Sequence, residues 1–137
     1  ISVVVAGGGY GHNLPKLRNL HHIGRLERHE VPGLLVEADI GLAPYPNVDY
    51  GFSPLKIYEY MGCNLPVVAT LLPSIEEATQ GHALLVRSGQ MADAISKIIN
   101  NEKLLSELSD SAFKYASRER TWSKTIAKTI ELYKGLL

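Results

Sequence analysis

The sequence contains a single cysteine, no long apolar run and no excess of either charge. One cysteine cannot form an internal disulfide or build a zinc site by itself, so Cys63 is interpreted as a packing residue in a reducing compartment. The fourteen basic residues are balanced by fourteen acidic ones, which argues against the broad cationic surface that binding to nucleic acid or to an anionic membrane would need. Any anionic ligand must therefore be bound by a local site.

Membrane and metal signatures are also missing. The longest nearly apolar run, residues 65–73, is far shorter than the ~20 residues of a membrane-spanning helix, and no basic-then-apolar leader opens the chain. The histidines are not joined to cysteine or acid clusters with metal spacing, and the adjacent His21 and His22 would face opposite ways on a strand. We therefore expect no membrane span, no signal peptide and no metal site.

What is present is enough for one folded domain. Of the 137 residues, 45% are hydrophobic and 20% are charged, a balance typical of a globular chain with its own core. The first strand pattern already begins at Ile1, without a starting methionine. We therefore expect residues 1–137 to be a single domain excised from a longer protein.

Strand and helix patterns alternate along most of the chain. Strands are expected at 1–6, 20–23, 40–43, 66–70 and 82–86, and helices at 15–18 (at most one short turn), 30–38, 53–63, 74–79, 90–100 and twice between 103 and 137. Continuously apolar strands such as 65–69 are typical of parallel strands that are buried on both faces. The sequence thus predicts an α/β fold with a doubly wound, Rossmann-like parallel sheet and C-terminal helices.

The last expected helix is amphipathic. Its apolar residues recur at steps of three or four and form one stripe, which consists of Trp122, Ile126, Ile130, Tyr133 and Leu137. We interpret this stripe as a packing surface and not as a ligand site, because such stripes usually belong to a core.

The helix expected after the long connection opens with an unusual residue. Ser53 is suited to cap this helix and Pro54 to its first position, but Lys56 then places a cation where the helix terminus is already electropositive. A phosphate or carboxylate bound by the first amide groups would make this lysine favourable. The alternative is a solvated lysine that pairs with Glu59 or Tyr60 one turn on.

Glu59 favours the first of these interpretations. In an open parallel sheet, ligands bind outside the carboxyl ends of the strands, and the connection 44–52 leaves such an end. Glu59 shares a helix face with Leu55, one turn after the helix start. Its sequence neighbours are apolar, so its carboxylate is expected to need partners, which the two hydroxyls of a ribose would supply. A nucleotide diphosphate therefore fits this helix.

These residues carry a resemblance to a known family. Residues 53–62 (SPLKIYEYMG) and 65–70 (LPVVAT) resemble the signature of the donor-binding domain of GT-B glycosyltransferases, the large retaining group of the group 1 or family four type. Weaker matches in the same order cover nearly all of the chain, at 3–9 (VVVAGGG), 23–26 (IGRL), 34–42 (LLVEADIGL), 83–86 (ALLV) and 121–123 (TWS). The resemblance implies a domain that binds a nucleotide-diphosphate sugar, either a UDP- or a GDP-hexose.

The resemblance also implies roles for individual residues. Glu59 is similar to the second acid of the family's paired-glutamate motif, which holds the ribose of the donor. The segment whose amide groups meet the diphosphate corresponds to Ser53, Pro54, Leu55 and Lys56.

Two loops are expected near other parts of the nucleotide. Gly24 and Arg25 match the family's loop near the nucleobase, and the glycine turn with Gly8 and Gly9 is expected to approach the nucleotide. The glycine spacing in that turn does not fit a dinucleotide fingerprint, so NAD is not the expected ligand.

The chain departs from the family pattern at the transferred sugar. The first acid of the pair would fall eight positions before Glu59, and that position is Gly51. Asp49, two residues earlier, is the candidate substitute, so the donor sugar is assigned to the segment that holds Asp49, Gly51 and Phe52.

The implied activity is transfer of a hexosyl group from the nucleotide sugar to an acceptor with retention. Charges and amide dipoles around the diphosphate would stabilise the leaving group, and no metal, cofactor or protein nucleophile is required. The family's N-terminal acceptor domain and the first strand and helix of the donor domain would be missing, so we expect this fragment alone to be inactive. The expected location is the cytoplasm, or the inner membrane face through the missing domain or the acceptor. A non-catalytic nucleotide- or phosphosugar-binding module and a GT-B nucleotide-sugar epimerase are the alternatives.

Overall fold

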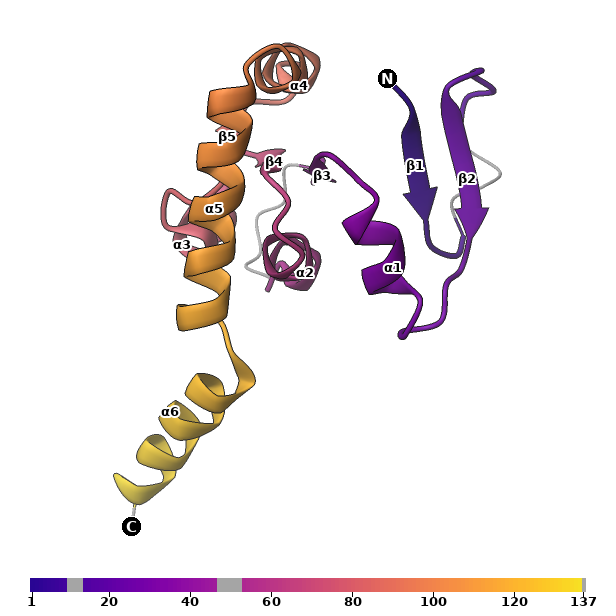
Figure 1. The fold of residues 1–137 in the computed structure, drawn as a ribbon. Coiled ribbons are helices and arrows are strands. Elements are labelled where there is room, and N and C mark those ends of the chain that lie inside the picture. Colours follow the sequence, from indigo (N-terminus) through magenta and orange to yellow (C-terminus); the bar gives the residue numbers. More distant parts are fainter. Residues whose placement is uncertain (10–13, 47–52, 137) are drawn as a thin grey trace. The chain divides into compact units, whose positions relative to one another are not determined.

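The computed structural model describes residues 1–9, 14–46 and 53–136. Its elements in chain order are β1 (Val3–Ala6), β2 (Leu20–Gly24), α1 (Val31–Val36), β3 (Gly41–Ala43), α2 (Leu55–Gly62), β4 (Val67–Thr70), α3 (Pro73–Thr79), β5 (Leu84–Val86), α4 (Met91–Ile99), α5 (Glu102–Glu119) and α6 (Trp122–Lys134). The elements labelled in Figure 1 belong to two compact units, Ile1–Leu34 and Leu35–Leu137, and the boundary between these units falls inside α1.

The first unit is built on two parallel strands. β1 pairs with β2 from Val3, which lies beside Leu20, to Ala6, which lies beside Gly24. Residues 15–18 form no helix, so the short helix expected there is not present. Four residues offer at most one hydrogen-bonded turn, and the nucleation of a single turn is unfavourable.

The second unit contains a parallel sheet of three strands in the order β3, β4, β5. The central strand β4 is fully enclosed, since Val67 is 1% exposed and Val68 and Ala69 are both 0% exposed. A strand that is buried on both faces needs apolar side chains at every position, which is the continuous pattern that the sequence shows here. The predicted parallel pairing is confirmed.

Successive residues of β4 face two different parts of the core, as the pleat of a strand requires. On one side Val67 and Ala69 pack against apolar side chains from three helices, α2, α3 and α5; these are Ile57, Met61, Leu72, Ile75, Ala112, Tyr115 and Ala116, with Leu72 just before α3. On the other side Val68 packs against Ala94 and Ile98 of α4. Helices therefore cover both faces of this sheet, and the expected doubly wound, Rossmann-like arrangement is confirmed.

The strand β3 begins at a glycine for a steric reason. A Cβ atom at Gly41 would lie 2.5 Å from Cδ2 of the Tyr60 ring, so no larger side chain fits without movement of α2. The Tyr60 hydroxyl donates a hydrogen bond of 3.3 Å to the carbonyl oxygen of Leu42. This ring therefore ties α2 directly to β3.

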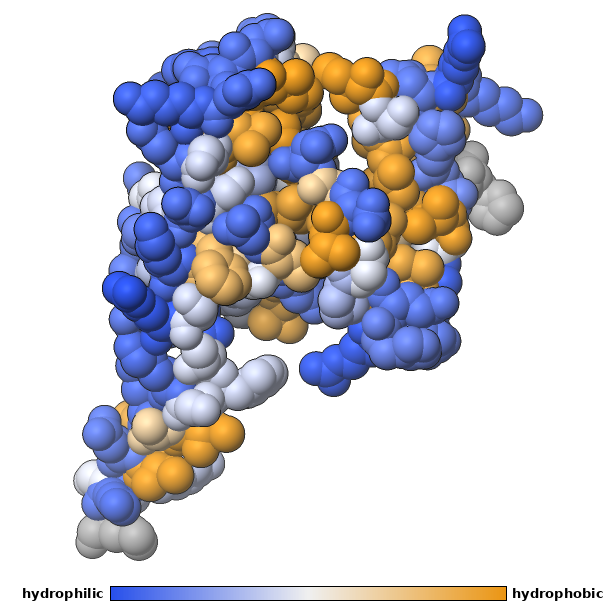
Figure 2. All heavy atoms as spheres, in the orientation of Figure 1, coloured by the Kyte–Doolittle hydropathy of each residue, from blue (hydrophilic) through white to orange (hydrophobic). Residues whose placement is uncertain are grey.

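The apolar stripe of α6 is not packed. Trp122 is 72% exposed, Ile126 55%, Ile130 48% and Tyr133 67%, and no described residue of α6 is buried. Figure 2 shows hydrophobic side chains gathered on this helix, open to solvent. The expected packing surface is therefore wrong for these four residues within this chain, while Leu137 lies outside the described residues. An amphipathic period predicts the face of a helix, but it does not supply the surface that would cover that face.

The helix α6 is held at its start by polar contacts. The Thr121 side chain caps it by accepting a hydrogen bond of 3.3 Å from the Lys124 amide. The Lys124 ammonium group pairs with the Glu119 carboxylate at 2.8 Å, and this contact lowers the pKa of Glu119. None of the helices in the described part of the chain combines the length and the apolar character that crossing a bilayer would need.

Candidate functional site

The glycine turn and the base-side loop predicted from the sequence lie together in the first unit. β1 and β2 are parallel, so their carboxyl ends meet at one edge. There the Gly7 amide donates to the Gly24 carbonyl oxygen at 2.7 Å, and His22 Nε2 lies 3.1 Å from the Gly7 carbonyl oxygen, to which it can only donate. Gly24 needs its glycine because its φ is +75°. Arg25 follows this residue and is exposed.

The turn itself presents its backbone to solvent. Gly8 and Gly9 are both exposed, and Gly9 has a φ of +90°, a conformation that favours glycine. The contact of His22 with this turn was not expected from the sequence, which only suggested that His21 and His22 face opposite ways. Nothing in the local pattern of β2 indicates that an imidazole would reach the end of the neighbouring strand.

The start of α2 differs from the expected capped helix. Pro54 occupies the cap position with φ −82° and ψ 67°, no side chain caps the helix, and Leu55 is its first residue. The Leu55 amide donates to the Ser53 carbonyl oxygen at 2.9 Å. This bond and the angles of Pro54 describe an inverse γ-turn, which delays the helix by one residue. The expected Ser53 cap is therefore wrong, and Lys56 is the second helical residue instead of the third.

Two amide groups in the first turn of α2 are already engaged in backbone hydrogen bonds. The Ile57 amide donates to the Pro54 carbonyl oxygen at 2.9 Å, in addition to the bond between Leu55 and Ser53. A phosphate bound here would have to meet Lys56 and the remaining backbone, or replace one of these bonds. The structure keeps Ser53, Pro54, Leu55 and Lys56 together as one turn at the carboxyl side of β3.

Lys56 finds an aromatic partner. Its ammonium nitrogen lies 5.1 Å from the centre of the Tyr45 ring, within the range of a cation–π contact. Among the ion pairs of the described residues there is none between Lys56 and Glu59, although these side chains lie one turn apart. Burial is the main cause that raises the pKa of Tyr45, so its ring stays neutral beside the lysine. Tyr45 was not identified from the sequence.

Glu59 is exposed, which corrects one step of the sequence argument. Leu55, Glu59 and Gly62 lie on the solvent side of α2, whereas Ile57 and Met61 are completely buried on the opposite side. The apolar residues next to Glu59 in the sequence therefore do not surround its carboxylate, which water can hydrate. A ribose is not required to compensate a buried charge, but the carboxylate is open to a ligand.

A hollow opens between the start of α2, the helix α3 and the residue that follows α5. Its volume is about 420 Å³, and its lining residues are Ser53, Pro54, Tyr58, Ser74, Glu77, Ala78 and Arg120. It thus includes two of the predicted diphosphate residues, Ser53 and Pro54. Lys56 and Glu59 are not part of its lining and lie on the adjoining exposed surface of α2.

Arg120 is the residue of this hollow that the sequence pattern did not indicate. It follows α5, yet its guanidinium group reaches α3, where Nη2 donates to the Ala78 carbonyl oxygen at 3.1 Å. The same group lies 5.4 Å from the centre of the Tyr58 ring on α2. An arginine just after a helix is a common surface residue, so no local signal could have placed it here.

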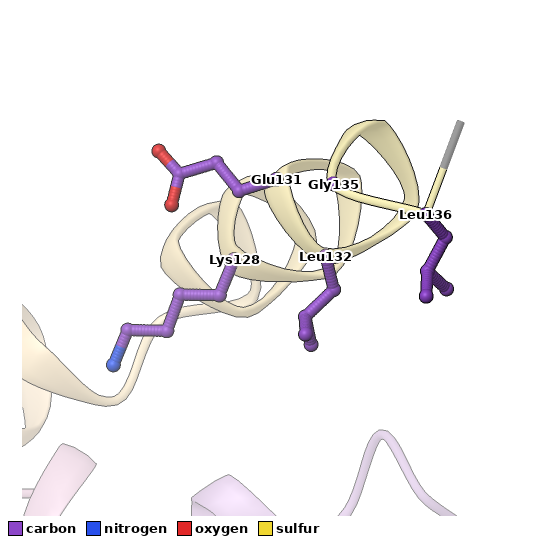
Figure 3. Close-up of a pocket in the computed structure, with 5 residues that line it drawn as sticks. All are labelled: Lys128, Glu131, Leu132, Gly135 and Leu136. Atoms are coloured by element: carbon purple, nitrogen blue, oxygen red, sulfur yellow. The ribbon is translucent and has the colours of Figure 1, made fainter.

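A second hollow, of about 520 Å³, runs along the exposed side of α6. It is lined by Lys128, Glu131, Leu132, Gly135 and Leu136. In Figure 3 all five come from one helix end, and Leu132 and Leu136 extend toward one side while Glu131 points elsewhere. One helix cannot enclose a small ligand, so this surface is not a candidate for the chemistry.

Two further expectations concern metal and donor sugar. In the part of the chain that the structure describes, no three histidine, cysteine, aspartate or glutamate side chains gather in a way that could hold a metal ion. Asp49, Gly51 and Phe52, to which the donor sugar was assigned, lie outside the described residues.

Comparisons with known proteins agree on one family. Residues 1–101 match the family model described as "Glycosyl transferases group 1". The chain is 31% identical over 107 residues to the putative teichuronic acid biosynthesis glycosyltransferase TuaH of Bacillus subtilis, an alignment that covers 77% of this chain and 26% of TuaH.

Solved structures show the same fold. The crystal structure of Anabaena HepE in complex with UDP-glucose matches with a TM-score of 0.73 and 20% identity, over 95% of this chain and 40% of that chain. The structure of WaaG, a glycosyltransferase involved in lipopolysaccharide biosynthesis, matches with a TM-score of 0.67 and 18% identity, over 86% of this chain and 34% of that chain. The chain therefore spans well under half the length of TuaH, HepE and WaaG.

Proposed function

Since the chain belongs to the group 1 glycosyl transferases, enzymes of the GT-B fold, we propose that it is the donor-binding domain of a hexosyltransferase. The substrate is a nucleotide-diphosphate sugar, a UDP- or GDP-hexose, and the hexosyl group passes to an acceptor with retention of configuration. Catalysis then takes place in a longer protein that also contains an acceptor domain, and residues 1–137 alone are inactive. The place of action is the cytoplasm or the inner membrane face.

One observation carries this proposal. HepE, which matches 95% of this chain, was crystallised with UDP-glucose, so this arrangement of strands and helices is compatible with a nucleotide-sugar ligand. In the present chain α2 begins at the carboxyl side of the sheet, where open α/β sheets bind ligands. Lys56 and Glu59 both lie on the exposed side of that helix.

The diphosphate is assigned to the start of α2. The positive end of the helix and the ammonium group of Lys56 both favour an anion at Ser53, Pro54 and Leu55. When the bond from the sugar to the diphosphate breaks, negative charge grows on the leaving phosphate. A fixed cation and fixed dipoles stabilise that charge more than they stabilise the bound donor, which lowers the barrier. No metal or other cofactor is part of this proposal.

The other parts of the donor are assigned by exposure and by resemblance. Glu59 accepts hydrogen bonds from the ribose hydroxyls, which an exposed carboxylate can do without any rearrangement. The nucleobase is assigned to Gly24 and Arg25, with the turn at Gly8 and Gly9 near the nucleotide. The transferred sugar is assigned to the segment with Asp49, Gly51 and Phe52.

Titration calorimetry with UDP and with GDP tests the proposal. We expect the wild-type chain to bind one of them weakly and Glu59→Ala to bind it about tenfold more weakly, because one carboxylate loses two hydrogen bonds to the ribose. The control is Glu37→Ala, which removes an exposed acid that follows α1. Circular dichroism should show the same fold for all three. Absence of binding to both nucleotides would refute the proposed function, and unchanged binding by Glu59→Ala would refute the ribose role.

A further inference from the structure

Arg120 links the end of α5 to the end of α3. Its Nε donates to the Tyr115 hydroxyl at 2.7 Å, and its Nη2 donates to the carbonyl oxygens of Ala78 at 3.1 Å and Glu77 at 3.3 Å. The Tyr115 hydroxyl in turn donates to the Ala78 oxygen at 2.9 Å. A fixed cation at carbonyl groups in the last turn of a helix also interacts favourably with the helix dipole. The guanidinium group is thus held in one position by several directed contacts.

The same guanidinium group also reaches α2. It lies 5.4 Å from the centres of the Tyr58 and Tyr115 rings. Tyr58 stands one turn after Pro54 on the same side of α2, and both line the hollow together with Ser53 and Arg120. Arg120 therefore connects α2, α3 and α5, and it meets α2 one turn after the start of that helix.

The start of α2 is anchored by the buried Ile57 side chain and by the contact of Lys56 with Tyr45, but few hydrogen bonds fix its direction. No side chain caps the helix, and the entry turn at Pro54 is closed by the single bond from the Leu55 amide to the Ser53 oxygen. The direction of the first amide groups therefore depends on the packing of Ile57 and also on how the following turn is packed. That turn contains Tyr58, whose ring lies against the Arg120 guanidinium group.

The geometry points to Arg120 as a positioning residue for the donor diphosphate: through Tyr58 it fixes the direction of the first turn of α2. This inference rests on the proposed function, because it assigns the diphosphate to that turn. Small changes in the position of a binding group weaken its interaction with a ligand strongly. In this role Arg120 does not touch the nucleotide sugar. Its planar guanidinium group carries several N–H groups, so it can hydrogen-bond all three oxygens and lie against a ring at the same time, which a lysine cannot do.

Two measurements on the 137-residue chain test this role. The variants are Arg120→Met and Arg120→Lys, and the control is Arg118→Met, which removes an exposed arginine from the last turn of α5. Calorimetry compares the affinities for UDP and UMP, or for GDP and GMP if the wild-type chain binds GDP instead, because the second phosphate adds contacts with the start of α2. We expect the preference for UDP over UMP to fall about tenfold in Arg120→Met, to fall also in Arg120→Lys, and to stay unchanged in Arg118→Met.

Amide hydrogen exchange supplies the second measurement, which does not depend on a ligand. We expect faster exchange in the first turns of α2 in Arg120→Met, while the amides of β4 exchange as in the wild type. A merely stabilising role would raise exchange in both regions and would leave the ratio of UDP to UMP affinity unchanged. Unchanged exchange in α2, or an unchanged affinity ratio, would overturn the inference.

Variants of Tyr58 test the same contact independently, in case the arginine variants do not fold. Tyr58→Leu removes the ring and should reproduce faster exchange in α2 and the loss of UDP preference, while Tyr58→Phe keeps the ring and should behave as the wild type. Equal behaviour of the two would overturn the role of the ring contact. If the wild-type chain binds neither UDP nor GDP, the proposed function fails and the ligand role of Arg120 fails with it. The exchange data then still decide whether Arg120 holds the start of α2.

Discussion

The ammonium nitrogen of Lys56 lies over the ring of Tyr45, 5.1 Å from its centre. This contact explains how a cation is accommodated in the first turn of α2, where the helix dipole is unfavourable to it. The negative face of the ring offsets part of that cost, and the lysine stays on the exposed side of the helix. The sequence left open a solvated lysine that pairs with Glu59 or Tyr60; among the described residues the ion pair with Glu59 is not formed.

The contact between Lys56 and Tyr45 should be measurable as a coupling energy. We expect a double-mutant cycle of Lys56→Met and Tyr45→Leu to give about 0.5–1 kcal/mol, the range of an exposed cation–π pair. Urea unfolding of the four proteins supplies the free energies of unfolding. Tyr45→Leu loses its other contacts whether Lys56 or methionine occupies position 56, so their energies cancel in the cycle. Tyr45→Phe keeps an aromatic face and serves as the control, and a coupling near zero would show that the ring does not stabilise the lysine.

Tyr60 should make the chain sensitive to alkaline pH. The pKa of its phenol is raised above the ordinary value of 10.0, first by burial and then by the nearby Glu59 carboxylate. The folded chain thus holds this proton more tightly than the unfolded chain does. The resulting stabilisation is complete below pH ~10 and is lost as the pH rises through the raised pKa of the folded state. We expect the urea midpoint to fall in that range.

Two variants isolate the contribution of Tyr60. Tyr60→Phe should lower the free energy of unfolding at neutral pH by about 0.5–1.5 kcal/mol, because it loses the hydrogen bond to the Leu42 oxygen. It should also show a smaller fall above pH ~10 than the wild type. The control Tyr133→Phe changes an exposed tyrosine on α6 and should follow the wild-type curve. Identical pH dependence of Tyr60→Phe and the wild type would contradict the assignment.

The sequence predicted the order of strands and helices well because burial leaves a clear pattern. β4 is apolar at three successive positions, and only a strand covered on both faces would need that; the structure confirms it in Val67, Val68 and Ala69. The cap of α2 was predicted at Ser53, one residue before its observed position at Pro54. The difference arises from a γ-turn at Pro54, which uses the same residues that a capped helix would use.

The site was harder to predict because it depends on directions and on distant contacts. Glu59 was placed among apolar neighbours because Ile57 and Met61 are close to it in the sequence, but α2 turns these side chains to its opposite side. Arg120 contacts carbonyl groups that are 42 and 43 positions away in the chain. No local pattern contains such a contact, whereas the meeting of Gly7 with Gly24 follows from parallel pairing alone.

The exposed stripe of α6 leads to a prediction that separates amphipathic character from packing. Trp122 and Ile126 are 72% and 55% exposed, so their removal leaves no cavity and loses little buried apolar surface. We expect Trp122→Ala and Ile126→Ala to change the free energy of unfolding of the 137-residue chain by less than about 0.5 kcal/mol. The matched control is Ile98→Ala, at a residue that is 0% exposed. It should cost about 2–5 kcal/mol, because it opens a cavity against Val68. Chemical denaturation measures all three, and a cost above about 2 kcal/mol for Trp122→Ala would mean that the stripe packs against the rest of the chain in solution.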